Sequence, residues 1–126
     1  MAFYWFFEDV SPVRRLKDEY CELVDDLNYQ IKRIEGNIKN ISNSIDDLHK
    51  TLNSYSSAKG IMAELYYSKI EESINNYKNI LISCEDALEN VIKRRNQAIE
   101  IRDKLQYYYQ IEQRDDVEFS LGEISL

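Results

Sequence analysis

The chain has 126 residues, of which 44% are hydrophobic and 31% are charged, and its formal net charge is -7. This balance is typical of one folded domain and argues against a globally disordered chain. Acids outnumber bases, and neither predicted helix offers a basic face, so nucleic-acid binding is not expected. The three glycines and the single proline leave few places where a helix would be interrupted.

An aromatic leader occupies residues 3–7 and is followed by Glu8 and Asp9. A secretory signal peptide needs basic residues ahead of its apolar core, and none precedes this run. No apolar stretch reaches the roughly 20 residues that cross a bilayer, so membrane insertion is not expected. Two interpretations of the leader stay open: a cap over the end of the helices, or an exposed anchor for a partner. A membrane surface is the least favoured, because anionic lipid would repel the two acids.

The first helix is predicted to span about residues 12–55. Ser11 can cap its N-terminus, and Pro12 suits the first helical position. Apolar residues then recur every three or four positions, which is the period of a helix with one buried stripe. This array, the seam of the first helix, comprises Leu16, Tyr20, Leu23, Leu27, Ile31, Ile34, Ile38, Ile41, Ile45, Leu48, Leu52 and Tyr55. Two consecutive steps of four, from Leu23 to Ile31, predict a local break in the heptad.

The second helix is predicted to span about residues 61–113, after a turn at about residues 56–60. Its seam comprises Tyr67, Ile70, Ile74, Tyr77, Leu81, Cys84, Leu88, Val91, Arg95, Ala98, Arg102, Leu105 and Tyr109. A connection this short requires the two helices to pack antiparallel. The sequence therefore predicts an all-α fold, an antiparallel two-helix hairpin similar to a coiled coil, as a single domain over residues 1–113. Residues 114–126 are predicted to form an acidic flexible tail.

Arg95 and Arg102 occupy seam positions that usually hold apolar residues. Polar residues in a seam lower stability but fix the register of the helices. If the hairpin turns near residue 58, facing residues have numbers that sum to about 118, which places both arginines close to Glu19 and Glu22. We therefore expect ion pairs between these arginines and these glutamates.

The second helix carries more apolar residues than one neighbouring helix can cover, whereas the first is polar outside its seam apart from Val13 and Val24. An apolar arc broader than a coiled-coil seam needs a further neighbour. We predict a partner interface on the second helix, formed by Ile80, Ala87, Ile92, Ile99 and Ile101. The alternative is that these are single exposed residues, which are common on protein surfaces.

No constellation of catalytic or metal-binding residues is evident in the sequence. His49 is the only histidine, and no cysteine or second histidine lies at ligand spacing from it. Adjacent acids such as Asp25 and Asp26 lie on polar helix faces, where nothing would exclude water from them. There is no glycine-rich phosphate loop and no nucleophile elbow. We expect a protein that is not an enzyme and that holds neither a cofactor nor a metal.

An acidic helical hairpin with a central turn resembles the WXG-type small proteins of the bacterial type VII secretion system. More specifically, the chain resembles the α-helical accessory proteins encoded beside LXG toxins in Gram-positive bacteria, and its richness in Ile, Asn, Lys and Tyr suits such a genome. The Trp-x-Gly turn of WXG-type proteins corresponds here to residues 58–60, Ala-Lys-Gly, which keep the glycine. The Tyr-x-x-x-Asp/Glu secretion signal of that system corresponds to Tyr108 and Glu112, with Phe119 and Glu123 as an aromatic variant.

The resemblance implies that the protein binds the elongated helical N-terminal domain of an LXG toxin, with or without a second small helical protein, and helps to target it to type VII secretion. It also implies a cytoplasmic protein, with co-secretion alongside the toxin left open. Two other functions stay open. One is a homodimeric structural four-helix bundle that uses the same isoleucines, and the other is an immunity protein that blocks a basic target with its acidic tail.

Overall fold

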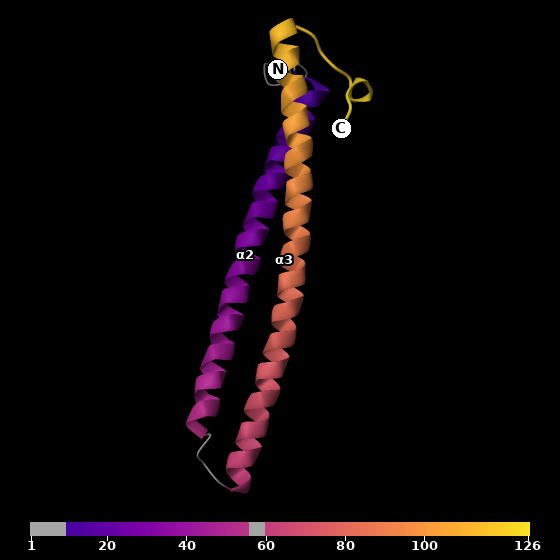
Figure 1. Ribbon diagram of the computed structural model, residues 1–126. Coiled ribbons are helices and arrows are strands. Elements are labelled where there is room, and N and C mark those ends of the chain that lie inside the picture. The colour runs from indigo at the N-terminus through magenta and orange to yellow at the C-terminus, as the bar shows by residue number, and fades with distance from the viewer. Residues whose placement is uncertain (1–9, 56–59) are drawn as a thin grey trace, which may run out of the picture. The chain divides into compact units, whose positions relative to one another are not determined.

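The computed structural model describes residues 10–55 and 60–126, except for the side chain of Tyr55. The aromatic leader and most of the predicted turn lie outside the described residues. The chain forms two long helices, α2 (Pro12–Tyr55) and α3 (Ile61–Asp115), and the short 3₁₀ helix η1 (Leu121–Glu123). The described ranges contain no strand, and α2 and α3 pack against each other (Figure 1). The prediction of an all-α two-helix hairpin is therefore confirmed.

The structure divides into two units, each built from a stretch of α2 and an antiparallel stretch of α3. The terminal unit comprises the described residues 10–29 and 92–126. The central unit comprises the described residues 30–55 and 60–91. Such a division is expected of any long helix pair, because each residue contacts only residues within a few turns of its own level, and the single domain over residues 1–113 stays a prediction.

The starts of both long helices are set by the residue that precedes them. Ser11 Oγ accepts a hydrogen bond from the backbone N–H of Arg14 at 3.1 Å, which satisfies one of the unpaired donors of a helix N-terminus. The predicted cap at Ser11 is therefore confirmed. Gly60, which precedes α3, has a φ of 117°, in a region where a side chain would be strained. Its carbonyl oxygen accepts the backbone N–H of Glu64 at 3.1 Å.

The core of the terminal unit combines small and branched apolar side chains from both helices. Val13 and Leu105 are fully buried. Val24 and Leu27 of α2 and Ala98 of α3 are less than one-tenth exposed. These residues give the terminal unit a compact interior along the contact between α2 and α3.

The seam of α2 in the terminal unit differs from the predicted array. Leu23, predicted in the seam, is 42% exposed, whereas its neighbour Val24 is 3% exposed. The buried side chains Val13, Val24 and Leu27 and the half-buried Lys17 and Tyr20 form one array with regular steps of four and three. The predicted break in the heptad is therefore wrong, because Val13 and Val24, predicted outside the seam, belong to it.

The central unit buries fewer side chains than the terminal unit. Ile31 and Ile45 of α2 and Ile74 of α3 are less than one-tenth exposed. Other residues of its seam, such as Ile38 and Leu81, are only half-buried. Each helix of an isolated pair can cover one stripe of its neighbour, so the flanks of that stripe stay in water.

Helix α3 ends in a turn that redirects the chain. Asp116 has a φ of 54°, and the backbone N–H of Val117 donates to the carbonyl oxygen of Glu112 at 3.2 Å. A left-handed residue followed by this bond is a common helix C-terminal motif, and Asp is one of the few non-glycine residues that tolerate it. The turn directs the following residues back along α3.

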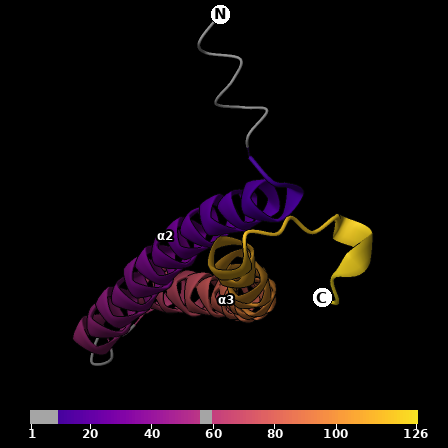
Figure 2. The ribbon, with the colours of Figure 1, turned by 90° about the horizontal axis from the view of Figure 1, so that it is seen from above.

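Residues 117–126, the C-terminal segment, lie beside the last turns of α3 (Figures 1 and 2). The backbone N–H of Ser125 donates to the hydroxyl oxygen of Tyr108 at 3.3 Å. Lys104 Nζ donates to the carbonyl oxygen of Leu126 at 2.9 Å. The segment predicted to be a flexible tail thus makes specific contacts, because its backbone groups and Phe119 meet partners on α3 that its acidic composition does not reveal.

Candidate partner-binding surfaces

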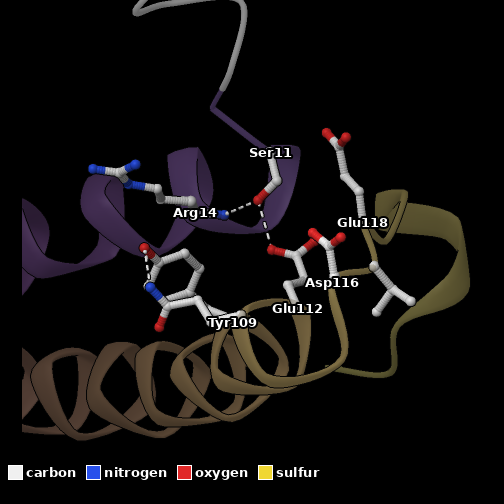
Figure 3. Close-up of a pocket in the computed structure, with 8 residues that line it drawn as sticks. Ser11, Arg14, Tyr109, Glu112, Asp116 and Glu118 are labelled. Atoms are coloured by element: carbon white, nitrogen blue, oxygen red, sulfur yellow. Dashed lines mark hydrogen bonds between the residues drawn. The ribbon is translucent and has the colours of Figure 1, made fainter.

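The terminal unit contains a carboxylate, Glu112, that is only 7% exposed. The Ser11 hydroxyl donates to its Oε1 at 2.7 Å (Figure 3), and the backbone N–H of Phe119 donates to its Oε2 at 2.8 Å. A buried charge is tolerated when both oxygens receive hydrogen bonds, and such charge-assisted bonds are stronger than neutral ones. Glu112 therefore joins the start of α2, the end of α3 and the C-terminal segment.

A hollow of about 360 Å³ lies beside this carboxylate (Figure 3). It is lined by Ser11, Arg14, Tyr109, Glu112, Gln113, Asp116, Val117 and Glu118. Three of these residues are acids and one is an arginine, so the lining is mostly polar. A small-molecule site usually has apolar walls around a few polar groups, and this hollow lacks them.

Tyr109 of α3 lies beside two cationic side chains in the first turns of α2. Lys17 Nζ lies 4.6 Å from the centroid of its ring, and the guanidinium carbon of Arg14 lies 5.9 Å from it. The face of an aromatic ring attracts cations at these distances. The Tyr109 hydroxyl accepts a hydrogen bond from Gln113 Nε2 at 3.0 Å. At the seam position of α2 that Lys17 occupies, the contact with α3 is therefore a cation–π contact and not an apolar one.

The two residues of the predicted secretion signal both contact the C-terminal segment. Tyr108 is half-buried, accepts the Ser125 N–H, and packs edge-on against Phe119 with ring centroids 5.6 Å apart. Glu112 lies four residues later on the same face of α3 and accepts the Phe119 N–H. Tyr108 and Glu112 therefore hold the C-terminal segment in place in this structure.

The two seam arginines do not make the predicted ion pairs. Arg95 Nη1 donates to Oδ1 of Asn28 on the facing helix at 3.3 Å. Arg102 Nη2 instead lies 3.2 Å from Oδ1 of Asp103, its neighbour in the chain. Arg95 thus faces α2 as predicted, but its partner is a neutral amide.

The prediction that Glu19 and Glu22 pair with the two arginines is wrong, because the side of α2 that faces α3 differs from the predicted seam. Glu22 is two residues from both Tyr20 and Val24, and two residues turn a helix by about 200°, so Glu22 lies on the side of α2 away from α3. The register differs as well, since the cross-helix hydrogen bonds of Glu112 and Arg95 join residues whose numbers sum to 123. Both glutamates line a separate hollow of about 240 Å³ with Val10, Arg15 and Asp18.

The predicted partner interface is divided between the two units. Ile80 is 49% exposed and Ala87 is also exposed, both in the central unit. Ile92, Ile99 and Ile101 are half-buried in the terminal unit. Ile99 and Ile101 are two residues apart and therefore leave α3 in nearly opposite directions. The five residues thus contribute to more than one surface.

Ile101 borders an apolar hollow of the terminal unit. The hollow has a volume of about 300 Å³ and is lined by Tyr20, Leu23, Leu27, Arg94, Gln97, Ala98 and Ile101. Among the lining residues that belong to α2, Leu23 is the most exposed, at 42%. An apolar side chain of another protein could bury the exposed part of Leu23 together with Ile101.

Helix α3 of the central unit exposes large apolar residues that the predicted interface leaves out. Ile61, Met62, Leu65, Tyr66, Tyr67, Tyr77 and Ile82 are between 38% and 78% exposed. Among the described side chains of α2, the exposed large apolar ones are Leu23 and Tyr29. Tyr67 and Tyr77 belong to the predicted seam but are each 38% exposed. The other exposed residues of α3 could have been identified from the apolar content of residues 61–82 at positions outside the seam.

Within the described ranges, no three His, Cys, Asp or Glu side chains lie close enough together to hold a metal ion. A hydrogen bond from the exposed Arg114 lowers the pKa of the neighbouring Asp115. Neither α2 nor α3 contains a stretch that is long and apolar enough to cross a membrane.

No known protein family, curated protein or solved structure matches this chain.

Proposed function

We propose that this chain is a non-enzymatic helical partner protein that binds the helical N-terminal domain of an LXG-type toxin and helps to target it to type VII secretion. The observation that carries the proposal is the unequal exposure of the two long helices. Helix α3 exposes apolar residues such as Met62, Tyr77 and Ile80, whereas α2 exposes chiefly Leu23 and Tyr29 among its large apolar side chains.

Further helices would remove this apolar surface from water. Burial is worth about 25 cal/mol for each Å² of apolar surface, and contiguous apolar surface on a folded protein usually marks an interface. Because seam residues of the central unit are themselves half-buried, helices added beside α3 would also complete the cover of the seam. A bundle shared with the toxin domain supplies such helices.

The contacts of Tyr108 and Glu112 bear on how a secretion signal would be read. Glu112 would have to give up hydrogen bonds from Ser11 and Phe119 before another protein could bind its carboxylate. Recognition of this pair would therefore require release of the C-terminal segment. Binding of the toxin domain near the end of α3 is the event that we expect to release it.

Co-expression with the helical N-terminal domain of an LXG toxin from the same genome tests the proposal. We expect a stable complex of the two chains, measured by light scattering after size-exclusion chromatography. Substitution of Ile92→Glu together with Ile99→Glu should abolish the complex while helix content, measured by circular dichroism, is kept. Lys93→Glu, at an exposed position of the same helix, is the matched control and should bind normally.

Two results would contradict the proposal. One is the absence of any complex with the toxin domain at micromolar concentrations of both chains. The other is a complex that forms equally well with the doubly substituted chain, which would show that this side of α3 does not touch the toxin. Loss of helix content in the double variant would instead identify Ile92 and Ile99 as internal residues and remove them from the interface.

A further inference from the structure

A second array of uncharged residues runs along α3 in the central unit. It shares Ile70, Tyr77, Cys84 and Val91 with the seam and adds Tyr66, Ser73, Ile80 and Ala87 on one flank. Its members are Tyr66, Ile70, Ser73, Tyr77, Ile80, Cys84, Ala87 and Val91, separated by alternating steps of four and three. We call this array the lateral face. Tyr66, Tyr77 and Ile80 are 54%, 38% and 49% exposed, and Ala87 is exposed as well. This spacing is that of a helix that packs against a further helix.

The lateral face is free of acidic residues although the chain as a whole is acidic. The acids of α3 in the central unit are Glu64, Glu71, Glu72, Glu85, Asp86 and Glu89. At about 100° per residue, each of them lies more than about 100° around the helix from the centre of the lateral face. The only charged residue at its margin is Lys69, beside Asn76, Ser83 and Asn90 at the equivalent heptad positions.

A neutral face suits contact with an identical chain. Two copies that each carry a net charge of -7 repel one another unless they meet where acids are absent. In a twofold contact the same patch supplies both sides, so any charged patch would oppose itself. The lateral face avoids this penalty, whereas the opposite side of α3, which carries Glu71 and Glu85, would incur it.

The lateral face is also self-complementary when two copies run antiparallel. The register that overlaps the whole array places Tyr66 against Val91, Ile70 against Ala87, Ser73 against Cys84, and Tyr77 against Ile80, each pair formed twice. Larger side chains thereby meet smaller ones in three of these four layers. Lys69 lies opposite Asn90 in this register.

We propose that the lateral face of α3 pairs with the lateral face of a second copy of this chain, antiparallel, to form a twofold dimer. This inference goes beyond the proposed function and does not require it. Because Ile80 and Ala87 also belong to the predicted partner interface, a toxin domain that covers them would displace the second copy. The dimer is then the form of the protein in the absence of its partner.

Measurement of mass in solution tests the dimer directly. The full chain, at tens of micromolar, should sediment with twice its monomer mass of 15.0 kDa. Ile80→Glu should weaken dimerisation at least a hundredfold, because it buries two unpaired carboxylates at the contact. Ile82→Glu is the matched control: Ile82 has a similar exposure of 56% but leaves α3 in nearly the opposite direction. The Ile82→Glu chain should remain a dimer.

Disulfide trapping tests the register independently of the effect of a charge. In a Cys21→Ser background, Ser73→Cys should form a disulfide with Cys84 of the second copy when oxidised glutathione is added as the oxidant. Within one chain these two positions are about 16 Å apart along the helix, too far for an internal bridge. Asn75→Cys, on the other side of α3, should not crosslink, and neither should Cys84 alone.

Each contrary outcome overturns the proposal in a distinguishable way. A chain that stays monomeric at all concentrations would mean that the lateral face has no second copy and is left for a helix of another protein. A dimer lost in Ile82→Glu but kept in Ile80→Glu would place the contact on the opposite side of α3. Crosslinking of Cys84 to Cys84 would mean parallel pairing. A dimer that persists when the toxin domain fails to bind would leave this inference intact and contradict the proposed function.

Discussion

The terminal and central units use the same two helices but differ in how completely they are packed. The terminal unit buries Val13 and Leu105 fully and adds hydrogen bonds that link α2, α3 and the C-terminal segment through Glu112. In the central unit, side-chain hydroxyls such as those of Ser44 and Ser83 donate to carbonyl oxygens one turn back on their own helix. The terminal unit is therefore the better packed of the two, and it is also the unit in which a third segment joins the helix pair.

Truncation of matched leucines should give the largest difference between the units. Leu105→Ala should lower the free energy of unfolding by about 3 kcal/mol, because the residue is fully buried and leaves a cavity. Leu88→Ala, at a half-buried position of the central unit, should cost only about 1 kcal/mol. Urea unfolding followed by circular dichroism measures both. Equal losses would contradict the difference in packing.

Removal of the buried carboxylate should have the next largest effect. Glu112→Ala should lower the free energy of unfolding by about 2 kcal/mol, because the Ser11 hydroxyl and the Phe119 N–H lose a charged acceptor. Glu112→Gln should cost less, since the amide oxygen still accepts one of these bonds. Faster amide exchange in residues 117–126 would show release of the C-terminal segment.

Glu118→Ala provides the control for this substitution. Glu118 lines the same hollow but is exposed, so its removal should leave both stability and exchange unchanged. Equal effects of Glu112→Ala and Glu118→Ala would show that the buried position of Glu112 has no special importance.

Two glycines allow a test with opposite signs. A Cβ added at Gly36, in the α2 part of the central unit, would meet no atom within 4 Å, so Gly36→Ala should raise the free energy of unfolding by about 1 kcal/mol through helix propensity. Gly60→Ala should lower it, because its φ of 117° strains any side chain. Thermal unfolding of both variants measures the pair. A destabilised Gly36→Ala chain would mean that a neighbouring helix approaches at this position.

Neutralisation of Glu19 or Glu22, the acids predicted to pair with the seam arginines, should have the smallest effect. Glu19→Gln and Glu22→Gln should each change the free energy of unfolding by less than about 0.5 kcal/mol, because exposed charges contribute little. Urea unfolding at low ionic strength is the sensitive condition, since salt screens surface charges. A loss of more than about 1 kcal/mol in the free energy of unfolding would instead support the predicted ion pairs with Arg95 and Arg102.

The helices themselves were predictable from the sequence because their signals are local. The three- and four-residue period of apolar residues, the Ser11 cap and the Pro12 position all depend on residues within a few turns of one another. The seam of α2 was harder to predict. An array through Leu16 and Leu23 and an array through Val13 and Val24 both have helical spacing, so either could have faced α3. Only the burial of Val24 beside the exposed Leu23 decides between them.

The period of the apolar residues could not predict contacts between segments that are far apart in the sequence. The prediction for Arg95 depended on an assumed turn near residue 58, and Arg95 instead meets Asn28. The role of Glu112 requires Ser11, 101 positions away. Phe119 was recognised only as part of a motif, whereas its backbone N–H and ring hold the C-terminal segment against α3. These contacts arise from three-dimensional packing that short-range spacing does not specify.

Amide hydrogen exchange of the monomeric chain tests most directly whether α3 of the central unit is left for another protein. The measurement should use a dilute sample of the Ile80→Glu variant, so that a second copy does not cover the lateral face. Amides of residues 62–91 are expected to exchange at least tenfold faster than those of residues 95–112, because incomplete packing lowers the cost of local opening. Equal protection of both stretches would contradict the conclusion that the central unit is an incomplete bundle.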